Sequence, residues 1–352
     1  MSDKTKPVRT DRKKTLRRIW RRTCIMHWLG RLLSVVLVLA LALMLLLHRL
    51  FLGPSPSVRS MLTMSLLESS ALKFVPYIYM SREDVDEIVR KSTVQEPEAQ
   101  TDASLINIPD PDQSADRGVS GTEPIELIEI KGATFKGYLL IVADPSRVFV
   151  GVAGDGYTAG RHLEFIVNKY GAVGGTNANG FEDKGGMGNG ANPLGLVISE
   201  GKTMHNNQQQ YAVAGFDKNN VLHVGHFSNA EIQQMELRDA VAYGPVLIVN
   251  GEAAHIESDS TGLNPRTAIG QRADGAVLLL VLDGRQADSL GAKYQDEIDI
   301  MLKYGAVNAC NLDGGTSSAM YFEGRRVNGT AAITGTRAIP CALLVRSAEN
   351  ED

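Results

Sequence analysis

Cysteine and histidine are scarce in this chain, and neither is grouped. There are three cysteines and seven histidines among 352 residues. No pair has the spacing of a Cys/His metal site, and His223 and His226 fall in a segment with the pattern of a strand. We therefore expect no such metal site and no cofactor. Binding of a divalent metal ion is possible, but the sequence does not indicate it. Cys310 and Cys341 lie in apolar segments, where a disulfide and two buried free thiols are both compatible with the sequence.

Two further features are missing. The chain has no Gly-x-Ser-x-Gly elbow and no histidine in a recognisable partner motif, which argues against a serine nucleophile of the hydrolase type. The chain also lacks an excess of basic residues after residue 31. Eleven of its 36 Lys and Arg lie in residues 1–31 beside two acids, which leaves 25 bases against 38 acids in residues 32–352. Such an acidic domain argues against nucleic acid as a partner but permits a phosphorylated substrate, because local arginines decide that.

Only one long apolar run is present. Residues 32–47 carry no charge, proline or glycine. This run is slightly short of the roughly 20 residues that span a bilayer, but Arg31 and Arg49 at its ends can snorkel. We predict a single transmembrane anchor over residues 30–52 in the cell membrane, a basic cytoplasmic tail over residues 1–29, and an extracellular location for the rest. A cleaved signal peptide is the alternative, which the long basic region and the lack of a small-x-small site disfavour.

Residues 53–122 connect the anchor to the rest of the chain. Ser60–Phe74 and Ser81–Val89 have helical patterns, and the second has a serine cap and acids in its first turn. Residues 92–122 are rich in Glu, Asp, Gln, Ser and Pro, which is typical of a flexible tether. We expect stalk helices followed by a flexible acidic linker.

Residues 123–352 have the pattern of one domain. Alternation over residues 125–130 predicts an early strand, and residues 229–238 predict a helix capped by Ser228. The strand, helix and strand of residues 276–312 predict parallel pairing of the two strands. The expected fold class is α+β (mixed α/β), a mixed β-sheet domain with flanking helices that is large enough for one core.

Four segments of this domain set polar side chains beside glycines at the ends of apolar runs. The most pronounced is residues 307–320, with Asn-Leu-Asp-Gly-Gly at 311–315 and two serines. Tandem glycines let backbone amides face an anion, and a carboxylate is rarely buried without partners. An ordinary Asp-Gly hairpin turn explains this segment alone equally well. Four clusters in one domain nevertheless predict a single convergent pocket, and the other three are residues 174–181, 264–270 and 282–286.

In this order and spacing, the four segments resemble the phosphodiester glycosidase family over about residues 123–347. The most specific are Asn-Leu-Asp-Gly-Gly, Pro-Arg-Thr-Ala-Ile-Gly at 265–270 and Asp-Gly-Arg at 283–285. Thr316 departs from the pattern, since many members have a third glycine there. The resemblance implies hydrolysis of an N-acetylglucosamine-like sugar 1-phosphodiester at the anomeric C–O bond. It also implies a membrane-anchored enzyme linked to cell-surface or exported polysaccharide.

The predicted site residues follow from this chemistry. A phosphate leaves readily, so cationic stabilisation by Arg266 and Arg285 matters more than a strong general acid, although a structural ion pair is the alternative for each. Asp313 is the first candidate for the catalytic carboxylate, as base or nucleophile. Asp283 is the second, with the orientation of an arginine or a loop as its competing role. The predicted substrate-binding residues are Asn177, Arg266, Thr267, Arg285, Asn311, Gly314, Gly315, Ser317 and Ser318, with the two asparagines facing sugar hydroxyls or an acetamido group.

Two other function classes stay open. A noncatalytic glycan-binding or exopolysaccharide assembly factor would keep the amide contacts without needing the acids. A metal-dependent phosphodiesterase would break the P–O bond, usually with paired metal ions. The presence of both Asp283 and Asp313 favours the glycosidase over the binding factor.

Overall fold

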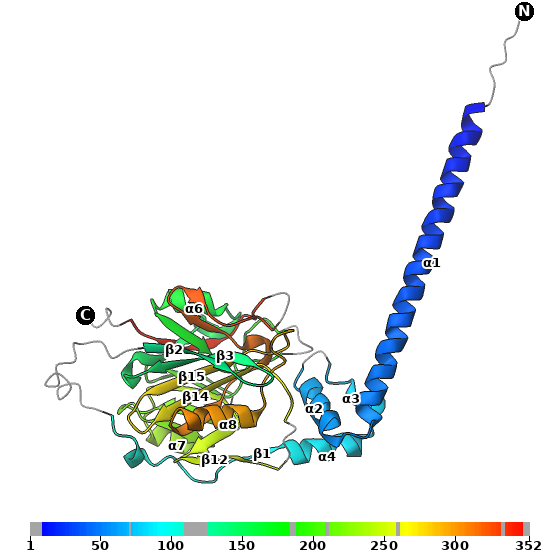
Figure 1. Cartoon of the computed structure of the whole chain (residues 1–352). Helices are drawn as coiled ribbons and strands as arrows, with labels where there is room; N and C mark the ends of the chain where they lie inside the picture. The colour runs from blue at the N-terminus through cyan, green and yellow to red at the C-terminus, as the bar shows by residue number, and fades with distance from the viewer. Residues whose placement is uncertain are drawn as a thin grey trace, which may run out of the picture. The chain divides into compact units, whose positions relative to one another are not determined.

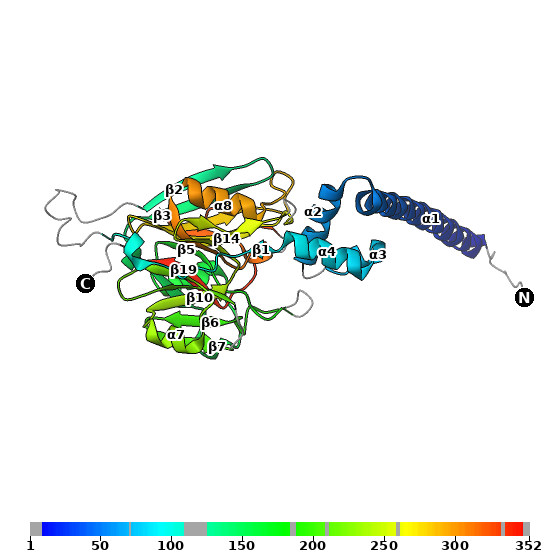
Figure 2. The same cartoon turned by 90° about the horizontal axis from the view of Figure 1, so that it is seen from below.

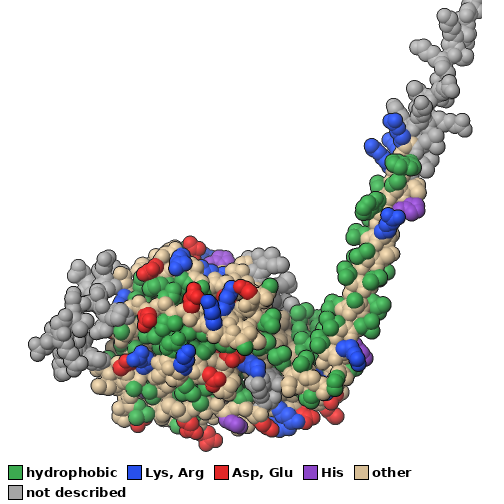
Figure 3. Space-filling view, viewed as in Figure 1, with side chains coloured by type: hydrophobic (Ala, Val, Ile, Leu, Met, Phe, Trp, Pro, Cys, Tyr) green, Lys and Arg blue, Asp and Glu red, His purple; other side chains and the backbone are tan. Residues whose placement is uncertain are grey.

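A computed structural model of the chain describes residues 9–69, 72–108, 125–183, 188–207, 211–257, 261–331 and 335–347. It forms two compact units, Met1–Ser55 and Pro56–Asp352. The first is one long helix, α1 (Arg9–Leu52), of which Trp20–Leu52 is long and apolar enough to cross a membrane. Its apolar side chains are exposed around the helix (Figure 3), including Leu37 at 61% and Leu39 at 63%. By length and composition this helix is a candidate membrane span.

The second unit begins with three short helices, α2 (Pro56–Leu67), α3 (Pro76–Tyr79) and α4 (Arg82–Ser92). The hydroxyl of Ser81 accepts a hydrogen bond from the amide of Asp84, and the Asp84 carboxylate accepts one from the Ser81 amide. This reciprocal capping box fixes the start of α4, as the sequence predicts.

The residues after α4 run along the domain. Strand β1 (Val94–Gln95) pairs antiparallel with β13 (His255–Ile256). Further on, Thr101 accepts a hydrogen bond from the amide of Val224 at 3.0 Å, and the amide of Asp102 donates to Asn250 Oδ1 at 2.8 Å. The sequence predicts a flexible linker over residues 92–122, whereas residues 94, 95, 101 and 102 pair with or hydrogen-bond to the domain. The remainder of the expected linker, residues 109–124, lies outside the described residues.

Three larger sheets build the domain, and every pairing within the described strands is antiparallel. The seven-stranded sheet has the order β12 (Glu252–Ala253), β11 (Val246–Val249), β16 (Ala306–Asn311), β14 (Arg266–Arg272), β15 (Val277–Leu282), β3 (Lys136–Val142), β2 (Ile125–Lys131). The second sheet has the order β18 (Arg325–Arg326), β17 (Met320–Phe322), β5 (Gly174–Asn177), β19 (Cys341–Val345), β4 (Val148–Val152). The third has the order β7 (Lys202–Asn206), β6 (Leu196–Ser199), β10 (Asp239–Tyr243), β8 (Ala212–Phe216), β9 (Leu222–Gly225).

The predicted parallel pairing of β15 with β16 is wrong. Both strands pair antiparallel with β14, which lies between them. The helix α8 (Tyr294–Lys303) still connects them, but its crossover passes over β14. The α+β class itself, with mixed helices and sheets, is confirmed.

One apolar core lies between the sheets, and it includes Val150 of β4, Val197 of β6 and Leu279 of β15. The other face of the seven-stranded sheet is covered by α8, whose Ile298 and Met301 belong to a second core. Helix α6 (Leu163–Lys169) packs on the second sheet, and α7 (Asn229–Gln234) packs on the third (Figures 1 and 2). Each sheet therefore shares the central core and carries a helix on its outer face.

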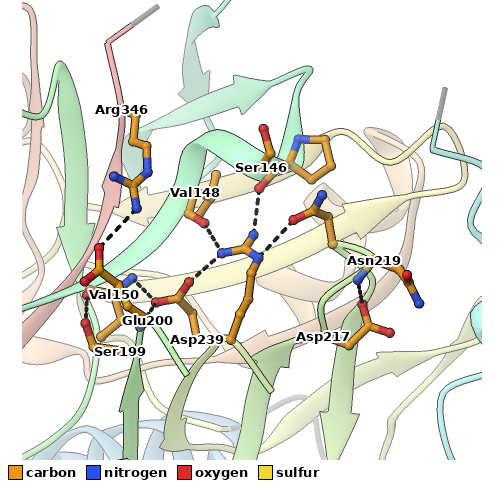
Figure 4. Close-up of polar contacts among 12 residues, drawn as sticks. Ser146, Val148, Val150, Ser199, Glu200, Asp217, Asn219, Asp239 and Arg346 are labelled. Atoms are coloured by element: carbon orange, nitrogen blue, oxygen red, sulfur yellow. Dashed lines mark hydrogen bonds and ion pairs between the residues drawn. The ribbon is translucent and has the colours of Figure 1, made fainter. Parts of the chain in front are cut away.

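A buried carboxylate joins the second and third sheets (Figure 4). Asp239, at the start of β10, accepts hydrogen bonds from the amides of Val150 at 2.9 Å and Glu200 at 3.4 Å. Ser199 donates to the Val150 carbonyl at 2.6 Å. Arg238 forms an ion pair with Asp239 and donates to the carbonyl of Val148 at 2.8 Å. Burial raises the pKa of Asp239, and the guanidinium and amide contacts oppose that shift.

Candidate active site

The four polar clusters do converge on one cavity, of about 230 Å³. Six predicted residues line it: Arg266, Arg285, Asn311, Asp313, Gly314 and Gly315. The cluster at 174–181 contributes Gly180 and Phe181. Residues outside the predicted catalytic and substrate-binding set complete the wall, among them Glu68, Asp183, Tyr243, Asn264 and Tyr294.

Asp313 follows the end of β16 and is partly buried in the cavity wall. Its main-chain amide donates to the carbonyl of Ala178 at 3.0 Å, which fixes the loop. Its carboxylate accepts hydrogen bonds from Ser317 and Tyr243. Burial nevertheless raises the pKa of Asp313 to about 6. A carboxyl with this pKa is ionised at neutral pH and can still exchange a proton close to it, which suits acid–base work.

The two arginines of the cavity differ. Arg266 is buried at 3% exposure, lies 3.8 Å over the ring of Tyr294 and forms a 3.1 Å ion pair with Glu68. Its Nε also donates to the carbonyl of Ala292 at 3.3 Å. Arg285 is exposed, and its Nη2 donates to Asn264 Oδ1 at 2.8 Å. Arg285 is therefore the accessible cation, whereas the guanidinium of Arg266 is engaged by the protein.

The glycine loop lies against Arg285. Gly315 has φ of 63°, and a Cβ built there would come within 3.4 Å of Arg285 Nη1. The positive φ favours glycine, whereas a Cβ at this distance would make only an ordinary van der Waals contact with the guanidinium. The Gly315 amide donates to the carbonyl of Pro265 at 2.9 Å, so it is used within the fold.

Asn311 carries an unused acceptor. Its Nδ2 donates to the carbonyl of Gly244 at 2.6 Å. Its Oδ1 is buried and accepts no hydrogen bond within the described part of the chain. Buried polar atoms are normally paired, so an unpaired acceptor in a cavity wall suits a ligand hydroxyl or amide N–H.

A profile of the phosphodiester glycosidase family matches residues 170–346. This chain belongs to the phosphodiester glycosidase family. The prophage-derived uncharacterized protein YomE of Bacillus subtilis (strain 168) is 35% identical over 95 residues, 26% of this chain and 15% of that protein. Bovine N-acetylglucosamine-1-phosphodiester alpha-N-acetylglucosaminidase is 30% identical over 150 residues, 37% of this chain and 28% of the enzyme. The aligned segments thus span less than a third of these curated relatives.

A solved structure shares the fold of this chain. It is the catalytic domain of the zebrafish N-acetylglucosamine-1-phosphodiester alpha-N-acetylglucosaminidase, auto-inhibited by its pro-peptide. The TM-score is 0.54 at 23% identity, and the match covers 64% of this chain and 82% of that domain.

Three of the predicted substrate-binding residues, Asn177, Thr267 and Ser318, are buried and are not among the residues that line the cavity. Thr267 donates to Asn177 Oδ1 at 3.0 Å, and its hydroxyl oxygen lies 3.2 Å from the hydroxyl of Ser318, from which it can accept. Asn177 Oδ1 also accepts from the amide of Ala319 at 3.0 Å. This buried network supports the loop that carries Asp313. Ser317 is also absent from the lining, but it contacts the Asp313 carboxylate directly.

Asp283, the second predicted carboxylate, is not among the residues that line the cavity. It is buried and accepts hydrogen bonds from Asn328 Nδ2 and the amide of Gly329, both at 3.0 Å. Its own carbonyl accepts from Ser289 at 2.7 Å. These contacts match the competing role expected for Asp283, which is to orient a loop.

Two residues of the cavity wall, Tyr243 and Glu68, have weak local signals in the sequence. Tyr243 is the last residue of β10, and the Gly-Pro pair that follows it is the one local feature that marks this position. Glu68 follows an ordinary apolar helix, and only folding brings it to Arg266, 198 residues further along the chain. Within the described ranges, no group of three or more His, Cys, Asp or Glu is placed to bind a metal. Cys310 and Cys341 are buried free thiols.

Proposed function

We propose that this chain is an active glycosidase that hydrolyses a sugar 1-phosphodiester at the anomeric C–O bond. The observation that carries the proposal is the carboxyl of Asp313 in the same cavity as Arg285. A phosphate is a weak base and leaves without strong protonation, so this chemistry needs a carboxylate at the sugar and a cation at the phosphate. The cavity supplies both.

In the proposed reaction the anomeric C–O bond breaks and its electron pair goes to the phosphate oxygen. Arg285 stabilises the charge on the departing phosphate. The ionised Asp313 either takes a proton from the attacking water or attacks the anomeric carbon itself, forming a glycosyl ester that water then hydrolyses to free sugar and carboxylate. Ser317 and Tyr243 hold Asp313 in place. Asn311 Oδ1 accepts a hydrogen bond from a sugar hydroxyl or an acetamido N–H. The bovine relative, whose name specifies N-acetylglucosamine 1-phosphodiesters, supports an N-acetylglucosamine-like sugar.

The location of the enzyme belongs to the same proposal. Residues 30–52, within the apolar stretch Trp20–Leu52, cross the cell membrane once, and the basic tail of residues 1–29 stays in the cytoplasm. Pro56–Asp352 then faces the exterior. A sugar 1-phosphodiester within exported or cell-surface polysaccharide is the substrate that such a location presents.

The test uses the full chain in detergent with UDP-N-acetylglucosamine and a methyl phosphodiester of N-acetylglucosamine 1-phosphate. We expect wild type to release free sugar and Asp313→Asn to release none, while Asp299→Asn on the exposed face of α8 keeps wild-type activity. In heavy-oxygen water the label should enter the sugar, and label in the phosphate would instead show P–O cleavage. The anomer formed, read by NMR, decides whether Asp313 activates water or attacks the sugar.

A further inference from the structure

We propose that Glu68, supplied by the segment between the apolar helix and the catalytic domain, is a positioning residue of the active site that sets Arg285 through Asn264. This inference rests on the proposed function and adds a residue outside the region matched by the family. It extends the catalytic unit along the sequence to the residue after α2.

The position of Glu68 is fixed by the packing of α2 on the loop before β14. Ser65 accepts a hydrogen bond from the amide of Leu263 at 2.8 Å. Gly262 has φ of 81°, and a Cβ there would come within 2.8 Å of the Ser65 nitrogen. The helix end therefore lies directly on the loop backbone, where no side chain fits between them. Glu68, one residue after α2, is placed in the cavity wall by this contact.

A short relay of hydrogen bonds leads from Glu68 to Arg285. Asn264 Nδ2 donates to the Glu68 carboxylate at 2.7 Å. Asn264 Oδ1 accepts from Arg285 Nη2 at 2.8 Å. Because both ends of the amide are engaged, its plane cannot rotate without the loss of both bonds. Glu68 thus orients the amide that holds the exposed guanidinium beside Gly315.

Glu68 also settles which arginine is available to a phosphate. Its carboxylate lies 3.1 Å from Arg266 and compensates that buried charge. Glu297, behind Arg266, cannot substitute, because it is fully buried, lacks a hydrogen-bond partner within the described residues and has its pKa raised to about 8 by burial. A carboxyl with this pKa is mostly neutral at pH 7. With Arg266 neutralised by Glu68, Arg285 is left as the cation for the substrate.

Glu68 forms part of the wall and does not plug the cavity. Its side chain is 26% exposed, and about 230 Å³ of the cavity remains open while the ion pair is formed. If the Glu68 carboxylate occupied the phosphate position, it would form a direct hydrogen bond with Arg285. Among the described residues, the Glu68 carboxylate hydrogen-bonds to Arg266 and Asn264, and its hydrogen-bonded link to Arg285 runs through the Asn264 amide.

The experiment measures kcat and KM of the full chain for the methyl phosphodiester of N-acetylglucosamine 1-phosphate. We expect Glu68→Ala and Glu68→Gln to lower kcat/KM at least tenfold, mainly through KM, and Glu68→Asp to restore part of it. In an Arg285→Ala background, Glu68→Ala should lower kcat/KM clearly less than it does in wild type, because the part of its effect that passes through Arg285 is already lost and only the pairing with Arg266 remains. Asp86→Ala on the exposed side of α4 is the matched control and should be neutral.

Several outcomes would overturn the inference while the proposed function stands. Activity of Glu68→Ala within twofold of wild type removes any role for the residue. A rise in activity would show that Glu68 blocks the site, and a full additive loss in the Arg285→Ala background would remove the relay. If wild type has no turnover, the proposed function fails, and calorimetry with N-acetylglucosamine 1-phosphate tests Glu68 separately. Tenfold weaker binding by Glu68→Ala supports the relay, whereas equal affinity, or no binding by wild type, overturns it.

Discussion

The side-chain amide of Asn177 donates a 2.5 Å hydrogen bond to the main-chain oxygen of Asp313. Asn177 ends β5 in the second sheet, and Asp313 follows β16 in the seven-stranded sheet. Its other amide atom accepts from Thr267 of β14. One buried asparagine thus joins two sheets at the point where the candidate catalytic carboxylate leaves its strand.

Replacement of this asparagine should damage both the fold and the activity. Asn177→Ala leaves the Asp313 carbonyl and the Thr267 hydroxyl without their partner, so we expect a loss of about 2 kcal/mol in the free energy of unfolding. Because the loop loses its anchor, kcat/KM should also fall about tenfold. Circular dichroism is the suitable probe of unfolding, since both tryptophans, Trp20 and Trp28, lie in α1. Thr267→Ser, which keeps the hydroxyl, is the control. Wild-type stability and activity in Asn177→Ala would contradict this account.

Asp313 should weaken the fold at neutral pH. Its pKa is raised to about 6, above the ordinary 3.8, so the folded state holds the proton more tightly than the unfolded state does. The resulting loss in the free energy of unfolding is absent below pH 4, grows as the pH rises toward 6 and is complete above pH 6. Discounted for partial exposure, it amounts to about 1–2 kcal/mol.

Asp313→Asn, although inactive, should therefore be more stable than wild type at pH 8 and equal to it at pH 4. Urea unfolding followed by circular dichroism at the two pH values measures this difference. Asp299→Asn should show no pH-dependent gain, because that carboxylate is exposed on α8. A less stable Asp313→Asn at pH 8 would mean that the hydrogen bonds from Ser317 and Tyr243 outweigh the cost of burial.

Arg285 should act on the phosphate and not on the sugar. Arg285→Ala is expected to lower kcat/KM for the phosphodiester about 10- to 100-fold, matching the roughly 1.5–3 kcal/mol of a hydrogen bond to a charged group. Arg285→Lys keeps the charge but loses the planar fork and should recover only part of the activity. A p-nitrophenyl glycoside of the same sugar, which lacks the phosphate, should be affected much less. Arg325→Ala, exposed on β18, serves as control, and an equal loss on both substrates would exclude this role for Arg285.

The buried ion pair between the second and third sheets should matter for stability alone. Asp239→Ala leaves the guanidinium of Arg238, only 21% exposed, without its counter-charge, and frees the amide of Val150. We expect a loss of about 3 kcal/mol in the free energy of unfolding, since one partner of a buried pair has been removed. The KM of the folded fraction should not change. The exposed pair of Lys218 and Glu236 offers a contrast, and Glu236→Ala should cost less than about 1 kcal/mol.

Local sequence was sufficient for the elements whose signals are carried within a few residues. The Ser81 and Ser228 caps, the apolar helix before residue 53 and the strand at residues 277–282 follow from capping chemistry and periodicity, which need no distant partner. The convergence of the four polar clusters on one cavity was also anticipated, because glycine beside acid, amide and guanidinium is unusual for a core.

What the sequence determined by itself was therefore the chemistry available to the site, with its carboxylate, its arginines and its glycine loop. Tertiary structure alone decided which of these groups face a ligand. Asp283 and Arg266 had the same local signature as Asp313 and Arg285, yet the first binds the turn at Asn328 and Gly329 and the second is engaged by Glu68. The tertiary structure also places β14 between β15 and β16, and Glu68 in the cavity wall. These outcomes depend on contacts between residues far apart in the chain, whose free energies no local pattern encodes.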